Sequence, residues 1–448
     1  MSGLDTAADI SIIGMFLLLG TVARAKVPFL EKLVMPASVV GGLFGLLMGS
    51  NGLGWIPSSE SMSTYATSLI DVVFGGLFLG RAIPSIRTMV KRAGAQAAYA
   101  YFNIVGQIAI GLLVVVLFGA AGVALHPMFA IQLAAGFQGG PGSATALAPT
   151  IEKLGWPATE SAAVGETCAV SGLLLSILFG VILANLGIAR GLTARRFGGE
   201  GGKVRSPTLV AEGKRKELGR EVTTPEAASS LAFNFCFVAL AILGGKLILL
   251  GLAQAAPPFK LLPSFPFVLV AGLLVQLLIQ KTKLDRYVDR GTIEALSAFA
   301  LDFLIVSSLM SIELKAVAVF ALPLTVMMAL GLAYNLWQAT WLAPRILPGA
   351  WFEKALCEWG QSTGSTPQAM LLLRMVDPRL ETDAAEAFAL KMFLFTPVVF
   401  PLVVALMPAM VSDGPGFFLL ACCLAMLVIL GCCRALTWQK RSGSIWQR

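Results

Sequence analysis

Charged residues are scarce in this chain of 448 residues. Asp, Glu, Lys and Arg make up only 13% of it, against roughly 25% in an ordinary soluble domain. Histidine is almost absent, with His126 as the one example. A single histidine excludes a His-based metal cluster, and because His126 lies in a predicted loop we expect no Ser/His/Asp catalytic set either. No G-x-x-x-x-G-K-[ST] motif for nucleotide phosphates occurs either. We therefore predict that the chain is not an enzyme, has no cofactor and is not an ATP-driven pump.

Metal-ligand spacing is also missing from the cysteines. All seven lie within apolar segments, where buried cysteine behaves as a small hydrophobic side chain. The net charge of +8 could indicate a nucleic-acid partner, but the basic residues cluster in short loops between apolar runs. That is the positive-inside pattern of membrane proteins. We expect a lipid bilayer around the chain and no nucleic-acid partner.

The chain is rich in long hydrophobic segments. Hydrophobic residues make up 57% of it, in runs long enough to cross a bilayer core of about 30 Å. The first run follows an acidic N-terminus without the basic region of a cleavable signal peptide, which predicts a retained helix. The pattern predicts an all-α polytopic membrane protein. The expected full helices are 8–23, 33–50, 64–80, 95–118, 161–188, 228–252, 264–280, 292–312, 316–342, 384–410 and 414–433.

Two glycine-rich stretches interrupt this pattern, 136–149 and 360–367. Irregular backbone in hydrocarbon survives only where it is buried in protein or lines a cavity. The apolar segments on either side of each break are about half a span long, which is typical of re-entrant segments. We therefore predict two re-entrant hairpins, at about 128–151 and about 352–376.

The breaks occupy matching places in two halves. We predict a first repeat at 1–188, a basic cytoplasmic linker at 189–227 and a second repeat at 228–411, followed by an extra helix and tail at 412–448. Most Lys and Arg lie on one side if the N-terminus is outside and the C-terminus is cytoplasmic. Each repeat then crosses five times, so the second copy is inverted and the hairpin tips meet near the midplane.

The hairpins carry the chemistry expected of a substrate site. Glycine lets backbone amides and carbonyls face a ligand, hydroxyls bind small polar solutes, and half-helix N-termini suit a carboxylate. The competing interpretation is close packing, with hydroxyls bonded back to their own helix. The candidate substrate-binding residues are Gly139, Gly140, Gly142, Ser143, Thr145, Gln361, Ser362, Thr363, Gly364, Ser365 and Thr366.

Ionisable residues inside a membrane are functional candidates by default. Glu166 and Asp302 lie deep in their helices, and for both a coupling role and a structural role stay open. Ser143 and Ser365 are further candidates for ion coupling. For Asp71 and Lys391 we favour interfacial or snorkelling groups, and Lys246 is expected to point outward.

At these motifs the chain resembles the bacterial sodium/glutamate symporter family. The likeness lies in Pro36 with Gly41-Gly42, Gly139-Gly140-x-Gly142-Ser143, Ala321-Leu322-Pro323 and Gly364-Ser365-Thr366-Pro367-x-Ala369. The resemblance implies a homodimeric elevator-type carrier in the bacterial inner membrane. It also implies scaffold helices at the dimer interface and import of glutamate driven by Na⁺.

The leading prediction is therefore a Na⁺-coupled carrier of a small carboxylate, most specifically glutamate. The alternative is a carrier of the same fold for another organic anion or amino acid, coupled to H⁺ or Na⁺. A channel or receptor is a third class, but no ring of charged side chains or filter motif supports a channel.

Overall fold

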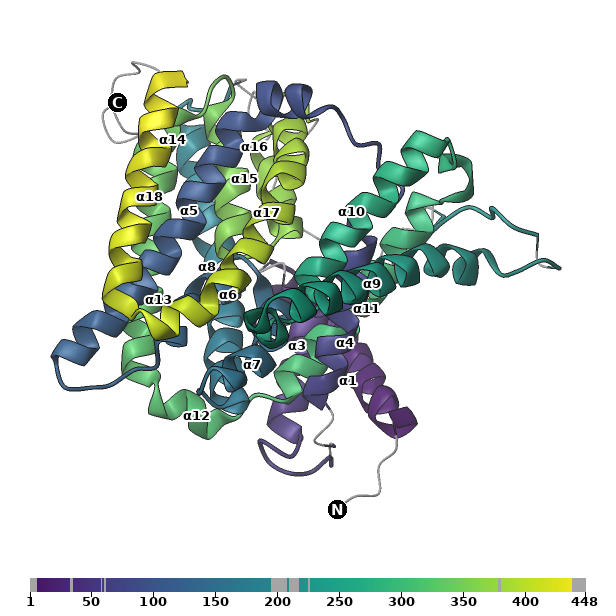
Figure 1. The fold of residues 1–448 in the computed structure, drawn as a ribbon, viewed down its shortest axis with the longest axis horizontal. Coiled ribbons are helices and arrows are strands. Elements are labelled where there is room, and N and C mark those ends of the chain that lie inside the picture. Colours follow the sequence, from purple (N-terminus) through teal and green to yellow (C-terminus); the bar gives the residue numbers. More distant parts are fainter. Residues whose placement is uncertain are drawn as a thin grey trace.

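The computed structural model describes residues 6–32, 35–57, 59, 62–194, 208, 217–224, 226–377 and 380–436. All regular elements in these ranges are helical, and eight helices are long and apolar enough to cross a membrane. Most of the predicted linker and the last twelve residues lie outside the described residues. The chain is thus a multi-pass helical membrane protein. The helices form two groups that lie side by side (Figure 1).

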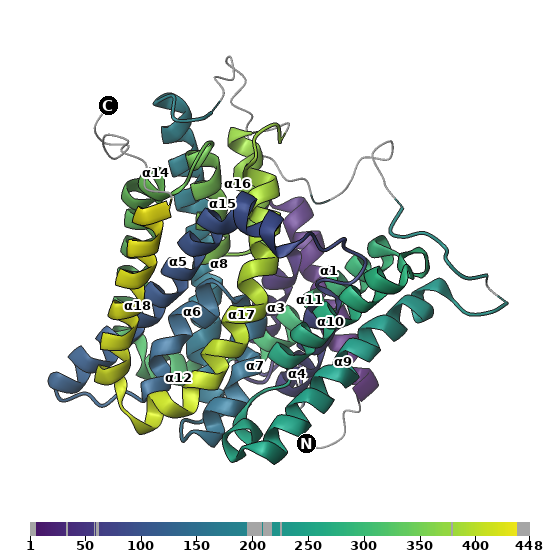
Figure 2. The same cartoon turned by 45° about the horizontal axis from the view of Figure 1, so that its top comes forward.

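The first group takes three main helices from each half of the chain. From the first half come α1 (Thr6–Lys26), the short α2 (Pro28–Lys32), α3 (Ala37–Met48) and α4 (Met62–Gly76). From the second half come α9 (Ser230–Ala255), α10 (Phe265–Thr282) and α11 (Arg290–Met310), with short 3-10 turns after α9 and α10. α11 packs on α3 and α4, and α9 packs on α10 (Figure 2). We call this group the α4–α11 bundle.

The second group contains both predicted hairpins and the longest helix. Its first-half members are α5 (Ile86–Ala120), a 3-10 turn (Pro127–Ile131), α6 (Gln132–Phe137), α7 (Gly140–Lys153) and α8 (Ala158–Ala189). Its second-half members are α12 (Leu314–Val319), α13 (Ala321–Trp337), a π turn (Gln338–Leu342), α14 (Ala343–Ile346), α15 (Trp351–Thr363), α16 (Thr366–Val376), α17 (Ala384–Ser412) and α18 (Pro415–Leu436). We call this group the α5–α8 bundle. The two bundles meet where α7 packs on α4 and α11 and where α10 packs on α17.

Three expected boundaries were wrong, each for a local reason. α5 begins at Ile86 rather than near 95, because the Ser85 hydroxyl accepts a hydrogen bond from the Thr88 amide and caps the helix. The expected helix 316–342 divides at Phe320, where Pro323 in the first turn of α13 fits a helix start. Its end widens into the π turn at Gln338, whose side-chain amide donates to the Tyr99 carbonyl of α5.

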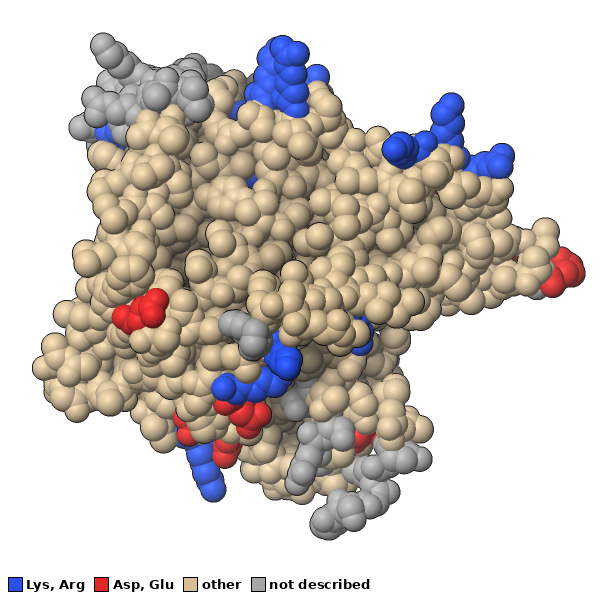
Figure 3. Space-filling view, in the orientation of Figure 1, with Lys and Arg blue, Asp and Glu red and all other residues tan. Residues whose placement is uncertain are grey.

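The surface is typical of a chain surrounded by lipid. On the face in Figure 3, most charged side chains lie along the upper and lower edges, with a broad uncharged area between them. The outer helices are mostly exposed: only 17% of the apolar 18-residue segment of α9, and 6% of that of α18, is buried inside the protein. The interior, in contrast, buries polar side chains, among them Asn103, Gln107 and Glu166. Apolar outside and locally polar inside is the arrangement expected of a transporter.

Candidate functional site

The first predicted hairpin is a helix–break–helix unit with a shorter break than expected. α6 ends at Phe137 and α7 begins at Gly140, so only residues 138–139 separate the helices. Most of the stretch 136–149 is helical, and that expectation of irregular backbone was wrong. Gly140 has a φ of +74° with no atom near its missing Cβ, which is the conformation that favours glycine at a sharp turn.

The second predicted hairpin has the same form. α15 ends at Thr363, Gly364 and Ser365 form the break, and α16 starts at Thr366. The Ser365 amide donates to the Gly360 carbonyl at 2.7 Å and closes the turn. A Cβ at Gly360 would lie 2.5 Å from the backbone of Ala369, so the two arms are in direct contact.

Both hairpin tips lie against one glycine of α8. A Cβ at Gly172 would lie 2.4 Å from the Thr363 carbonyl and 2.9 Å from Cδ1 of Phe137. Phe137 ends the first arm of hairpin one, and Thr363 ends the first arm of hairpin two. The missing side chain at 172 therefore lets the two tips approach each other over α8.

A cluster of buried amides holds hairpin two to its neighbours. Gln107 of α5 donates to the Ser362 carbonyl at 2.7 Å and to Asn103 Oδ1 at 3.0 Å. Asn103 donates to Asn335 Oδ1 of α13 at 2.7 Å, and Asn335 donates to Thr363 Oγ1 at 3.2 Å. From the sequence we considered ionisable residues and hairpin residues as candidates and did not include these amides. Their signal was present in the sequence, as neutral polar residues within apolar helices.

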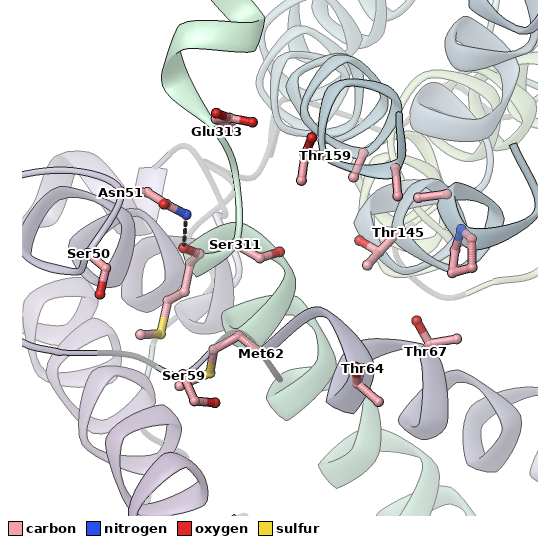
Figure 4. A pocket seen from close by; sticks show the side chains of 15 residues that line it. Ser50, Asn51, Ser59, Met62, Thr64, Thr67, Thr145, Thr159, Ser311 and Glu313 are labelled. Atoms are coloured by element: carbon pink, nitrogen blue, oxygen red, sulfur yellow. Dashed lines mark hydrogen bonds between the residues drawn. The ribbon is translucent and has the colours of Figure 1, made fainter. Parts of the chain in front are cut away.

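A cavity of about 610 Å³ lies between the two bundles, beside the second arm of hairpin one. Figure 4 shows Thr64 and Thr67 of α4 on one side, Thr145 of α7 and Thr159 of α8 on another, and Asn51 and Glu313 toward a third. The full lining is Ser50, Asn51, Ser59, Met62, Thr64, Thr67, Thr145, Ala148, Pro149, Ala158, Thr159, Ala162, Met310, Ser311 and Glu313. Glu313 is the one charged side chain in this described lining, and the other polar groups are hydroxyls and an amide.

Thr145 joins this cavity to a buried carboxyl group. Its hydroxyl lies 2.5 Å from Glu166 Oε1 of α8 and 2.6 Å from the Ser308 hydroxyl of α11. Ser308 also donates to Glu166 Oε1, at 2.7 Å. The side chain of Glu166 is fully buried, and its Oε2 has no hydrogen-bond partner among the described residues. Three oxygens in mutual contact share two hydroxyl hydrogens, so a further proton or a cation would complete the cluster.

The structure separates the predicted site residues rather than gathering them all. Of the eleven candidates for substrate binding, only Thr145 lines the cavity. Gly142 packs on Leu304 of α11, at the contact between the bundles, whereas Ser143 is buried beside Gly139 of its own hairpin. Ser362 and Thr363 are held by the amide cluster, and the Thr366 hydroxyl donates to Gln361 Oε1 at 2.6 Å. Asp302 is half-buried beside Ser38 of α3 and does not line the cavity.

Lys391 corrects the expectation of a snorkelling side chain. It is fully buried in α17, and its Nζ lies 3.0 Å from Glu358 Oε2 of α15. Asp71 is buried as well, and it accepts hydrogen bonds from Ser264 at the start of α10 and pairs with Lys246 at 3.6 Å. Lys246 itself remains 58% exposed, in agreement with the expected outward direction.

His126 is structural in this fold. Its Nδ1 accepts from the Met128 amide, its Nε2 contacts the Leu154 carbonyl, and its ring stacks on Trp156. It therefore ties the start of hairpin one to the loop after α7. Burial lowers the pKa of His126, although the bond to the Leu154 carbonyl acts in the opposite direction.

Comparison with known proteins agrees with the motifs. The Sodium/glutamate symporter family matches residues 2–380. A sodium/glutamate symporter of Escherichia coli (strain K12) is 25% identical over 424 residues, covering 89% of this chain and 99% of that protein. One from Shigella flexneri matches equally.

Among solved structures, a sodium proton antiporter from Methanocaldococcus jannaschii, MjNhaP1, is 15% identical, and the match covers 92% of this chain and 100% of the antiporter chain. Its TM-score of 0.41 is too low to support any argument. The family match spans most of the chain, and the protein belongs to the sodium/glutamate symporter family.

Proposed function

We propose that this membrane transporter imports glutamate together with Na⁺ by secondary active transport. The family and both relatives bear the name sodium/glutamate symporter. The observation that supports it in this chain is the polar cavity that ends at Thr145, directly in front of the buried Glu166. A carboxyl group with an unpartnered oxygen, reached through hydroxyls, is a suitable place for a coupling cation.

The coupling site in this proposal is Glu166 with Thr145 and Ser308. Carboxylate and hydroxyl oxygens are the ligands that hard cations prefer. Thr145 both lines the cavity and contacts Glu166, so a cation in the cavity could reach the Glu166 carboxylate past the Thr145 side chain. Ser143, Ser365 and Asp302 have no comparable arrangement and are secondary candidates.

Glutamate recognition falls to neutral donors in this proposal. The described lining of the cavity offers hydroxyls and an amide, and Glu313 could meet the ammonium group of the substrate. The hairpin residues from 139 to 145 and from 361 to 366 would complete the site when the tips open. Backbone amides and hydroxyls bind carboxylates without a permanent positive charge, which permits release.

The arrangement of the helices supports an inverted repeat and an elevator mechanism. Each bundle takes corresponding helices from both halves, α1, α3 and α4 with α9 to α11, and α5 to α8 with α12 to α17. We infer repeats at 1–188 and 228–411, with the α4–α11 bundle as the static scaffold and the α5–α8 bundle as the moving part. The orientation with the N-terminus outside, the homodimer and the inner membrane are parts of the same proposal.

One observation favours proton coupling as the second candidate. The three oxygens around Glu166 lie 2.5–2.7 Å apart, which is the spacing of O–H···O hydrogen bonds. A proton fits that spacing as it stands, whereas a Na⁺ ion would have to spread the oxygens. In this alternative Glu166 carries the proton, and the substrate is glutamate, another amino acid or another organic anion.

Uptake into liposomes tests the proposal. Purified protein is reconstituted, and labelled L-glutamate is supplied with an inward tenfold Na⁺ gradient or with choline in its place. Such a gradient stores about 1.4 kcal/mol per ion, enough for roughly tenfold accumulation per coupled Na⁺. Accumulation that needs Na⁺ is expected. If an inward proton gradient drives accumulation without Na⁺, the coupling ion is H⁺ rather than Na⁺. If neither gradient drives glutamate uptake, glutamate is not the substrate.

A further inference from the structure

The ion pair between Glu358 and Lys391 lies at the centre of the α5–α8 bundle. Lys391 Nζ is 3.0 Å from Glu358 Oε2 and 3.2 Å from Oε1, and both side chains are 0% exposed. Among the ion pairs within the described residues, this one alone has both partners fully buried. The pair joins α15, the first arm of hairpin two, to α17.

Every charged atom of the pair is occupied. Glu358 Oε2 also accepts from Gln96 Nε2 of α5 at 3.1 Å, and Lys391 Nζ lies 4.6 Å from the centre of the Phe388 ring. Glu166 differs, because its second oxygen has no hydrogen-bond partner in the part of the chain that the structure describes. Glu358 therefore has no free ligand to offer to a transported ion.

The pair lies close to the tip of hairpin two. Glu358 is five residues before Thr363, the last residue of α15, which is less than two helical turns. Gln96 donates to the Lys354 carbonyl as well as to Glu358, so two bonds tie this arm to α5. The first arm is thus held by α17 on one side and by α5 on the other.

Stability alone does not explain a buried pair. Removing two charges from water costs about as much as their attraction returns, and apolar side chains of the same volume are often equally stable. Inside a membrane the cost is higher, and buried ionisable residues there usually serve function. What the pair supplies and apolar packing does not is a directional bond that fixes the position of one helix against another.

We propose that Glu358 and Lys391 are positioning residues that clamp hairpin two and so keep its tip closed over α8. The effect on transport rests on the proposed function, but the position of the tip does not. Without the clamp, α15 is free to move away from α5 and α17, and the tip opens more often. Residues such as Ser362, which is 1% exposed, would then become accessible.

The test uses the neutral pair Glu358→Gln with Lys391→Met, which removes both charges and keeps the volumes. Each single variant would leave one buried charge unpaired and is expected to fold poorly. The double variant should keep a melting temperature near that of the parent. Ser362→Cys is introduced into a chain that retains Cys168 as its one native cysteine, and both thiols are labelled with a maleimide in detergent.

The expected result is labelling at position 362 that is about tenfold faster in the double variant, which corresponds to a 1.4 kcal/mol change in an opening equilibrium. Cys168, fully buried under hairpin one, should label at an unchanged rate. Arg92 and Glu386 form an exposed pair between α5 and α17, the two helices that hold the first arm of hairpin two. Their neutral variants, Arg92→Gln with Glu386→Gln, serve as the matched control and should label like the parent.

Unchanged labelling at 362 in the double variant would overturn the clamp. Faster labelling at both 362 and Cys168 would overturn it too, because the whole bundle would then have loosened. In liposomes the double variant should need more glutamate than the parent for half-maximal uptake, by the factor by which the closed population falls, at a similar maximal rate. If the parent transports no glutamate, the proposed function fails while the labelling still decides the clamp.

Discussion

Glu166 and Glu358 are both fully buried, yet their oxygens have different partners. Glu358 is bonded through both oxygens to Lys391 and through one to Gln96. Glu166 accepts hydrogen bonds from two hydroxyls on Oε1, and no described residue bonds its Oε2. The first carboxylate is neutralised within the protein, whereas the second needs a charge from outside it. Our two proposals, a clamp at Glu358 and ion coupling at Glu166, rest on this difference.

Substitution of Glu166 tests the coupling role. Glu166→Gln keeps the size and one acceptor oxygen but removes the negative charge that a cation would face. Loss of a charged partner costs about 1.5–3 kcal/mol, so we expect the Na⁺ concentration for half-maximal uptake to rise roughly ten- to a hundredfold. Na⁺ titration of glutamate uptake in liposomes measures it.

The matched control is Glu152→Gln, which makes the same chemical change at the exposed end of α7. It should leave the Na⁺ titration unchanged. A Glu166→Gln protein with the Na⁺ response of the parent would exclude Glu166 as the coupling residue. The secondary candidates, Asp302 foremost, would then be tested in the same assay.

At the scale of elements, α8 is the surface on which both hairpins pack. α6, α7, α15 and α16 all contact it. Its glycines make this possible, because at Gly165 the side chain of Gln132, and at Gly172 the two tips, fill the space that a Cβ would take. Glycine is thus needed at these positions for close approach rather than for unusual backbone angles.

Gly172→Ala should disturb both tips together. The added Cβ would lie 2.4 Å from the Thr363 carbonyl, so the backbone of hairpin two must move. Overpacking of this kind costs about 1–3 kcal/mol. We expect a lower melting temperature and weaker glutamate uptake.

Gly119→Ala is the control for this change, because a Cβ near the end of α5 would meet no atom within 4 Å. It should leave both the melting temperature and uptake unchanged. If Gly172→Ala also behaved like the parent, the tips would not be in contact with α8 under the conditions of the assay.

At the scale of the molecule, the cavity lies between two bundles, so its shape depends on how they are placed. Thr64 belongs to the α4–α11 bundle and Thr159 to the α5–α8 bundle, and both line the cavity. If one bundle moves against the other, a covalent bridge across the cavity must stop transport. A bridge within one bundle should not.

We therefore expect Thr64→Cys with Thr159→Cys to lose glutamate uptake after treatment with a bifunctional maleimide. The comparison pair is Thr64→Cys with Ser311→Cys, which lie on α4 and directly after α11 in the same bundle. Each single-cysteine variant is treated in parallel to measure the effect of a bound reagent alone. Equal uptake by both bridged proteins would argue against relative motion of the bundles.

Much of the architecture follows from local patterns. Apolar length alone determines that the chain crosses the membrane as helices, because only helices satisfy backbone polar groups within one segment. Clusters such as Gly139-Gly140 and Gly364-Ser365 mark the two breaks, because glycine interrupts an apolar run and permits the positive φ that Gly140 adopts. These are properties of residues within a few positions of one another, so the sequence by itself determined them.

The site depended on contacts between distant segments. Thr145, Glu166 and Ser308 come from three helices, and only their packing brings the oxygens within 2.7 Å. The depth of Lys391 could not be read from an apolar run, since a snorkelling and a buried lysine occupy the same sequence context. Lys391 is buried because it pairs with Glu358 of α15, which lies 33 residues away in the sequence. The sequence determined helices, breaks and family, whereas the tertiary structure decided which polar groups meet, because burial and pairing arise only when helices pack.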